Sequence, residues 1–259
     1  MNILVFTKRV PATQEEELRI IEEGQGIDLS KVPFKVNDWD NYAVEEAVQI
    51  AEKTGGSVTA ISIGDAESDE VLRRAIAMGT KDGFLIETEK VLHDPNARAT
   101  LVSEFLKKEG ISYDAIFTGV QSEDDQFAAM GGILSAKLGL PYSSMVIGID
   151  SFEKDHVIAR RELEGGLQER IKMTLPCVLS IQSGINEPRY VSIMGIRKAS
   201  KVERKFFKAK AYGDNISSTI EVVKWVYPPK KGGATMLSGE LEGICKDLLG
   251  ILKEKGVFQ

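Results

Sequence analysis

Short apolar runs alternate with longer amphipathic segments through the first half of the chain. The apolar runs have the length of buried strands and lie at 3–6, 58–63, 84–86 and 115–118. In the amphipathic segments, apolar residues recur every three or four positions, which predicts helices over 41–52, 69–78, 96–108 and 126–138. Strands that alternate with such helices are typical of a mostly parallel sheet covered on both faces. The pattern therefore predicts a doubly wound α/β domain over 1–184.

Two later segments predict a hairpin. Residues 156–161 and 168–174 alternate apolar and charged side chains on either side of Glu164-Gly165-Gly166. Pro176 then opens an apolar run at 177–181, which predicts a buried strand.

Beyond residue 184 the pattern changes to basic sequence interrupted by glycine and proline, with one more helical segment in 238–255. A tail with a single helix cannot bury much surface by itself. We therefore expect 185–259 to form a docking loop and an extended C-terminal arm that contacts a partner.

Composition narrows the class of protein. The 259 residues are 42% hydrophobic and 28% charged, enough for a substantial core. The formal net charge of -6 argues against a nucleic-acid binder, and we interpret the basic run from Lys198 to Lys210 as a solvated face. The sequence has no apolar run of about 18 residues and no basic leader, so we expect a cytoplasmic protein without a membrane span.

Several kinds of chemistry lack the residues they need. Cys177 and Cys245 imply no disulfide framework, and His93 and His156 have no neighbours at metal-ligand spacing. The sequence contains no Gly-x-Gly-x-x-Gly fingerprint and no P-loop, which disfavours a dinucleotide hydride-transfer enzyme and a phosphotransferase. A nucleophile, a base and an orienting acid cannot be assembled from the motifs. The sequence therefore favours a carrier over a catalyst.

Ligands of open parallel sheets bind beyond the carboxyl ends of the strands. Four segments compete for such a site, namely 6–10, 37–40, 63–65 and 119–130. The last runs from a strand end into a predicted helix, whose backbone N–H groups and dipole favour a phosphate. Its residues Glu123, Asp124 and Asp125 either oppose a bound anion or are ordinary carboxylates at a helix start. Trp39 is either a partly buried core aromatic or a ring at the site edge that covers an adenine.

The order of several separated motifs resembles one protein family. The resemblance to the signature region of the small (beta) subunit of electron transfer flavoprotein rests on Arg161-Glu162-Leu163-Glu164-Gly165-Gly166, Leu175-Pro176-Cys177-Val178 and Asn186-Glu187-Pro188-Arg189-Tyr190. Further similar motifs are Asn37-Asp38-Trp39-Asp40 and Gly119-Val120-Gln121-Ser122. The resemblance implies a heterodimer in which a larger alpha subunit carries the redox-active FAD and this subunit binds a structural AMP. Electrons would pass from a flavin-dependent dehydrogenase to a further acceptor.

The resemblance also implies positions for the binding residues. The AMP contacts would come from Phe6, Asn37, Asp38, Trp39, Asp40, Ile63, Gly119, Val120, Gln121, Ser122, Glu123, Asp124, Asp125, Gln126, Phe127, Ala128, Ala129 and Met130. The segment that docks on partner dehydrogenases would consist of Tyr190, Val191, Ser192, Ile193, Met194, Gly195, Ile196, Arg197, Lys198, Ala199 and Ser200. Ile193 stands where an anchoring leucine usually lies in the family.

Two alternatives stay open. Some members of the family bifurcate electrons and hold a second FAD in place of AMP, with a phosphate loop that reads Asp-Gly-Asp-Thr-Ala-Gln-Val-Gly. Residues 124–131 read Asp-Asp-Gln-Phe-Ala-Ala-Met-Gly instead, which favours AMP, although this loop also departs from other AMP-binding members. Gly119-Val120-Gln121-Ser122 and Asn37-Asp38-Trp39-Asp40 look closest to the branch paired with trimethylamine dehydrogenase. The second alternative is a stand-alone nucleotide-binding α/β protein, disfavoured because no lysine stands near the acidic residues of this loop in the sequence.

Overall fold

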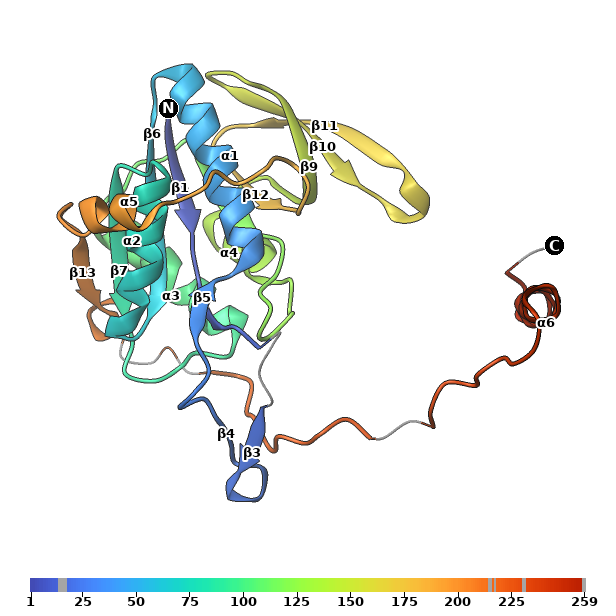
Figure 1. Cartoon of the computed structure of the whole chain (residues 1–259). Helices are drawn as coiled ribbons and strands as arrows, with labels where there is room; N and C mark the ends of the chain where they lie inside the picture. Colours follow the sequence, from blue (N-terminus) through green and yellow to red (C-terminus); the bar gives the residue numbers. More distant parts are fainter. Residues whose placement is uncertain (14–17, 214–215, 217, 230–231, 258–259) are drawn as a thin grey trace.

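A computed structural model describes residues 1–13, 18–213, 216, 218–229 and 232–257. Within these ranges, nine strands form one sheet in the order β11-β10-β9-β12-β8-β1-β6-β7-β13 (Figure 1). The strands are β1 (Asn2–Phe6), β6 (Ser57–Gly64), β7 (Asp82–Glu87), β8 (Ala115–Gly119), β9 (Tyr142–Phe152), β10 (His156–Glu162), β11 (Gln168–Thr174), β12 (Cys177–Ile181) and β13 (Lys205–Lys208). Neighbouring strands are parallel except in the pairs β9–β10 and β10–β11. The predicted mostly parallel sheet with a hairpin is confirmed.

Helices cover both faces of this sheet. The helices are α1 (Asp38–Thr54), α2 (Asp69–Met78), α3 (Pro95–Lys108), α4 (Met130–Leu138), α5 (Ile193–Ala199) and α6 (Leu241–Glu254). Because successive side chains of a strand point to opposite faces, Ile3 and Val5 pack with α1 and α2, whereas Leu4 and Phe6 pack with α3 and α4. Strands buried on both faces read as continuous apolar runs, which is why the sequence reveals them. No helix among the described residues is long and apolar enough to cross a bilayer.

The structure corrects several predicted elements. The prediction of one helix beyond residue 184 is wrong, because α5 packs on α2 and β13 extends the sheet beside β7. Tyr212 is also buried there, with its ring edge-on to Phe105 of α3. The helix predicted over 126–138 begins at Met130, because Gln126 and Ala128 have positive φ angles of 52° and 51°.

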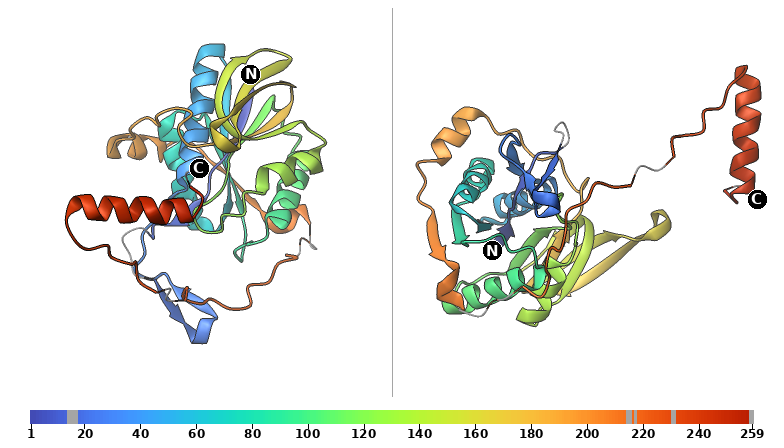
Figure 2. Two further views of the ribbon diagram at one scale, coloured as in Figure 1. Left: turned by 90° about the vertical axis from the view of Figure 1, so that its right-hand side faces the viewer. Right: turned by 90° about the horizontal axis from the view of Figure 1, so that it is seen from below.

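Two small antiparallel pairs lie outside the main sheet, β2 (Arg9–Pro11) with β5 (Phe34–Val36) and β3 (Arg19–Ile21) with β4 (Gly26–Asp28). The arm contacts the second pair, since Trp225 N donates to Gly24 O at 2.7 Å. The Tyr227 hydroxyl accepts from Ile20 N at 2.9 Å and donates to Leu18 O at 3.2 Å. Beyond Tyr227 the arm leaves the body, and α6 stands apart from it without a buried residue (Figures 1 and 2).

Candidate functional site

A pocket opens where β1, β6 and β8 end. It offers about 630 Å³ of empty space, counting the part open to solvent. The wall combines the carboxyl ends of these strands with the N-terminal ends of α1, α3 and α4, which is where open parallel sheets bind ligands.

Most of the residues predicted to bind a nucleotide line this pocket. They are Phe6, Asn37, Asp40, Ile63, Gly119, Val120, Gln121, Ser122, Asp125, Phe127, Ala128, Ala129 and Met130. The other predicted residues, Asp38, Trp39, Glu123, Asp124 and Gln126, lie outside its wall. The Trp39 indole donates from Nε1 to Gln182 Oε1 at 3.0 Å, so the ring is directed at β12 and its following turn rather than into the pocket.

The predictions missed five residues of the wall, namely Thr7, Lys8, Pro95, Arg98 and Thr118. Thr7 and Lys8 belong to the candidate segment 6–10, in which only Phe6 was singled out. Arg98 lies in the first turns of α3, and no motif in the sequence ties it to the acidic loop. No lysine stands near Glu123 to Asp125 in the sequence, but the fold brings Lys8 into contact with this loop, so the argument from the missing lysine is wrong.

Asp40 joins two of the loops around the pocket. Its Oδ2 accepts a hydrogen bond from Lys8 N at 2.8 Å, and its Oδ1 accepts one from Gly119 N at 3.2 Å. A side chain at Gly119 would meet Asp40 Oδ1 and lie 2.8 Å from Trp39 Cβ, so the loop can approach α1 this closely only with glycine here. Burial raises the pKa of Asp40 to about 7, against the opposing effect of hydrogen bonds from Asn37, Lys8 and Gly119.

Asn37 fixes the loop that follows β8. Its Nδ2 donates to Gln121 O at 2.9 Å, and its Oδ1 accepts from Glu123 N at 3.1 Å. Glu123 Oε1 in turn accepts from Asp38 N at 3.2 Å and pairs with Lys35 Nζ at 3.0 Å. Glu123 is therefore a carboxylate at the start of a helix, as one of the two interpretations predicts, but the helix is α1 rather than α4.

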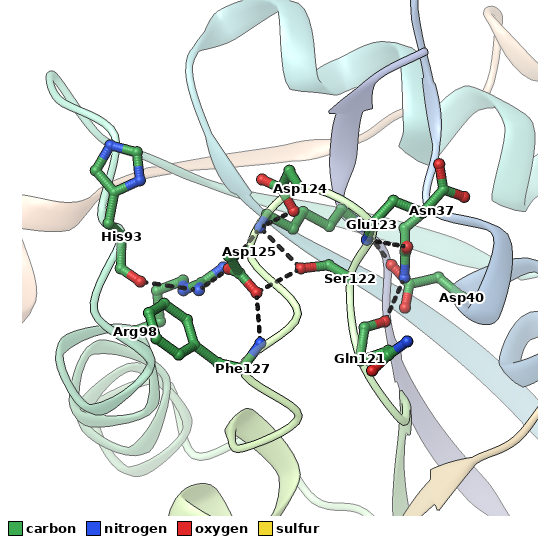
Figure 3. Close-up of polar contacts among 11 residues, drawn as sticks. Asn37, Asp40, His93, Arg98, Gln121, Ser122, Glu123, Asp124, Asp125 and Phe127 are labelled. Atoms are coloured by element: carbon green, nitrogen blue, oxygen red, sulfur yellow. Dashed lines mark hydrogen bonds and ion pairs between the residues drawn. The ribbon is translucent and has the colours of Figure 1, made fainter. Parts of the chain in front are cut away.

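Cations and carboxylates of the pocket are paired with one another. Lys8 Nζ contacts Asp124 Oδ1 at 2.6 Å, Asp125 Oδ2 at 2.9 Å and Ser122 Oγ at 3.1 Å. Arg98 Nη2 donates to the same Asp125 Oδ2 at 2.5 Å (Figure 3). Burial raises the pKa of Asp125, but the charges of Lys8 and Arg98 and their hydrogen bonds outweigh it and hold the pKa well below its usual range.

Two buried polar atoms of the wall lack a protein partner. Among the described residues, neither Thr7 Oγ1 nor Arg98 Nε has a hydrogen-bond partner, although both residues line the pocket. Buried donors and acceptors are rarely left unpaired, so these two atoms suit a polar ligand. No group of three or more His, Cys, Asp or Glu side chains in the described ranges could hold a metal ion.

The predicted docking segment forms a short helix rather than a loop. Ser192 Oγ accepts from Gly195 N at 3.1 Å and thereby caps α5, which packs on α2 and buries Ala199. Apolar side chains nevertheless face solvent here, because Tyr190 is 90%, Ile193 71% and Met194 65% exposed. Ile193 therefore does not pack beneath its own segment.

Comparisons with known proteins identify the family. A model described as "Electron transfer flavoprotein domain" matches residues 26–212. The electron transfer flavoprotein subunit beta of Methylophilus methylotrophus is 32% identical over 98% of both chains, and that of Bacillus subtilis is 31% identical over 98% of both. The mouse (Mus musculus) subunit beta is 29% identical over 99% of this chain and 98% of its own length. With its parallel sheet, its pocket at the strand ends and these matches along nearly its whole length, the chain belongs to the electron transfer flavoprotein beta-subunit family.

Proposed function

We propose that the chain is the beta subunit of a heterodimeric electron transfer flavoprotein and that its pocket binds a structural AMP. The observation that carries the AMP assignment is the pocket at the strand ends, in which Thr7 Oγ1 and Arg98 Nε are buried without a protein partner among the described residues. In this role the chain has no catalytic residues of its own. FAD, held mainly by the alpha subunit, supplies the electron-carrying chemistry when bound.

The wall of the pocket fits the parts of AMP. Its apolar residues, among them Phe6, Ile63 and Phe127, offer a surface for a purine ring. Hydrogen-bonding groups for a ribose and a phosphate come from Thr7, Ser122, the cations Lys8 and Arg98 and the start of α4. These groups come from separate segments of the chain, so a bound nucleotide would tie those segments together.

The C-terminal arm suits an alpha subunit as partner. Leu241, Leu248 and Leu249 of α6 are 77%, 46% and 51% exposed, and Val223 and Val226 of the arm are 87% and 69% exposed. An apolar surface of this kind marks an interaction site in a soluble protein. The family assignment supplies the identity of the partner.

The exposed side chains of α5 suit the flavin-dependent dehydrogenase that donates electrons. Tyr190, Ile193 and Met194 form an apolar patch, with Arg197 and Lys198 exposed on the same short helix. An apolar anchor with a charged rim is typical of transient docking sites. The further acceptor would receive the electrons from the FAD of the alpha subunit.

Two threonine variants test the AMP assignment. Thr7 and Thr80 are both buried with an unpartnered hydroxyl among the described residues, but only Thr7 lines the pocket. We expect Thr7→Val to weaken AMP binding by about fivefold, a net hydrogen bond of about 1 kcal/mol, while Thr80→Val binds as the wild type. Binding is measured by calorimetry on the full chain, and melting temperatures check both folds.

The nucleotide itself is identified by acid extraction and chromatography. The chain co-expressed with its alpha subunit should yield AMP and FAD in equal amounts. Recovery of FAD alone at two per heterodimer would favour the bifurcating type, and a folded protein without any nucleotide would exclude AMP. Equal AMP affinity for both threonine variants would remove Thr7 from the contact surface.

A further inference from the structure

The Asp125 carboxylate is bound as proteins bind a phosphate. Its Oδ2 accepts from Lys8 Nζ at 2.9 Å and from Arg98 Nη2 at 2.5 Å. Its Oδ1 accepts from Ser122 Oγ at 2.8 Å and from Phe127 N at 3.2 Å, just before α4 (Figure 3). Two cations, a hydroxyl and a backbone N–H form a donor set that also suits phosphate oxygens.

The charges of this cluster already cancel. Asp124 and Asp125 together carry as many negative charges as Lys8 and Arg98 carry positive ones, and the depressed pKa of Asp125 keeps it ionised. A phosphate monoester adds about −1.5 to −2 charges at neutral pH. A phosphate gains binding free energy from Lys8 and Arg98 only when it replaces Asp125 as their partner. Otherwise the phosphate lies next to a carboxylate of like charge.

We propose that Asp125 is an internal counter-anion that occupies the phosphate donor set of the pocket. This inference rests on the proposed binding of AMP and adds the means by which the site controls it. The pocket recognises the adenosine portion of the ligand, and the phosphate contributes little to affinity until Asp125 gives up Lys8 and Arg98. The carboxylate thereby lowers the preference for nucleotide over nucleoside.

The ratio of AMP affinity to adenosine affinity measures this competition directly. In the wild type we expect the two ligands to bind within about threefold of each other, since the phosphate gains nothing net. Asp125→Asn keeps the size of the side chain and an acceptor oxygen for Ser122 and Phe127 N, but it releases the charges of Lys8 and Arg98. The ratio should then rise about tenfold or more, as expected for charge-assisted hydrogen bonds to a phosphate.

Asp124→Asn is the matched control. Asp124 pairs only with Lys8 among the described contacts, its side chain is 29% exposed against 12% for Asp125, and it lies outside the pocket wall. Its removal should raise the ratio by less than about threefold. Calorimetry with AMP and adenosine is performed on the full chain freed of co-purified nucleotide, with inorganic phosphate as a third probe that should bind only Asp125→Asn.

The outcomes separate this inference from the assignment of AMP. A wild type that binds AMP, together with an unchanged or lower ratio in folded Asp125→Asn, would overturn the counter-anion alone. Failure of both ligands to bind any folded variant would overturn the AMP assignment and this inference with it.

If Asp125→Asn does not fold, the Arg98→Gln variant tests the counter-anion inference instead. With Asp125 holding Arg98, this variant changes the ratio of AMP affinity to adenosine affinity by less than about threefold, because any contact of Arg98 with the adenosine portion is lost for both ligands alike. A selective tenfold loss for AMP over adenosine would show that Arg98 already serves the phosphate, and the inference would be wrong.

Discussion

Replacing Asp40 by asparagine should flatten the pH dependence of stability between about pH 4 and pH 7. In the folded chain the pKa of Asp40 is about 7, raised from an ordinary 3.8 because the carboxyl is buried. The folded protein therefore keeps this proton over a range in which the unfolded chain has released it. The stability linked to it is fully present below pH 3.8 and is lost as the pH rises through about 7. Three pKa units correspond to about 4 kcal/mol of unfolding free energy.

The asparagine variant removes this titration but adds a penalty that does not depend on pH. An amide has one acceptor oxygen, so either Lys8 N or Gly119 N faces an NH2 group, which costs about 1–3 kcal/mol. Asp40→Asn should thus be less stable than the wild type at pH 4, and the difference should shrink or reverse at pH 8.

Urea denaturation followed by tryptophan fluorescence at both pH values measures the difference for the two proteins. Other titrating groups change both proteins alike and cancel in the comparison. A difference that stays constant or widens towards pH 8 would refute the reasoning, because it would mean that the two backbone N–H groups keep Asp40 ionised.

Two further predictions concern surfaces. Ile193 is 71% exposed, so most of its side chain is still available to be buried by a partner. Burying a whole isoleucine side chain contributes roughly 1.5–3 kcal/mol, which leaves about 1–2 kcal/mol for this contact. Ile193→Ala should therefore weaken dehydrogenase docking about 5- to 30-fold in electron-transfer titrations, at an unchanged melting temperature. Val91→Ala, at an equally exposed position away from α5, should transfer electrons as the wild type, and a matching loss there would contradict the docking role. Leu249→Asp on α6 should reduce co-purification of the alpha subunit by about tenfold or more, and full retention of the partner would count against α6 as its contact surface.

The central strands and the helices between them could be predicted because burial on both faces leaves a continuous apolar run. The long strand β9 could not be predicted, because Ser143, Ser144 and Gly148 interrupt its apolar pattern and its register with β10 shifts twice. β13 was missed for another reason: it is a short edge strand within a basic run, and its pairing with β7 depends on contacts distant in sequence.

The location of the candidate site was predictable to a similar degree. Parallel strands bring their carboxyl ends to one edge, so the loops that converge there follow from topology. Lys8 and Arg98 are far apart in sequence, and only the fold brings both to Asp125. The positive φ angles of Gln126 and Ala128 also delay the start of α4, which no propensity of these residues indicates.

The hairpin of β3 and β4 affects how α6 meets a partner. Because Trp225 and Tyr227 are hydrogen-bonded to this hairpin, the connection to α6 starts at Tyr227, beside the hairpin, rather than at Tyr212. A shorter tether confines the helix to a smaller volume and raises its effective concentration at a partner that touches the body. The body and α6 can then bind as the two halves of a bivalent ligand, and releasing Tyr227 from the hairpin would weaken association without removing a single contact with the partner.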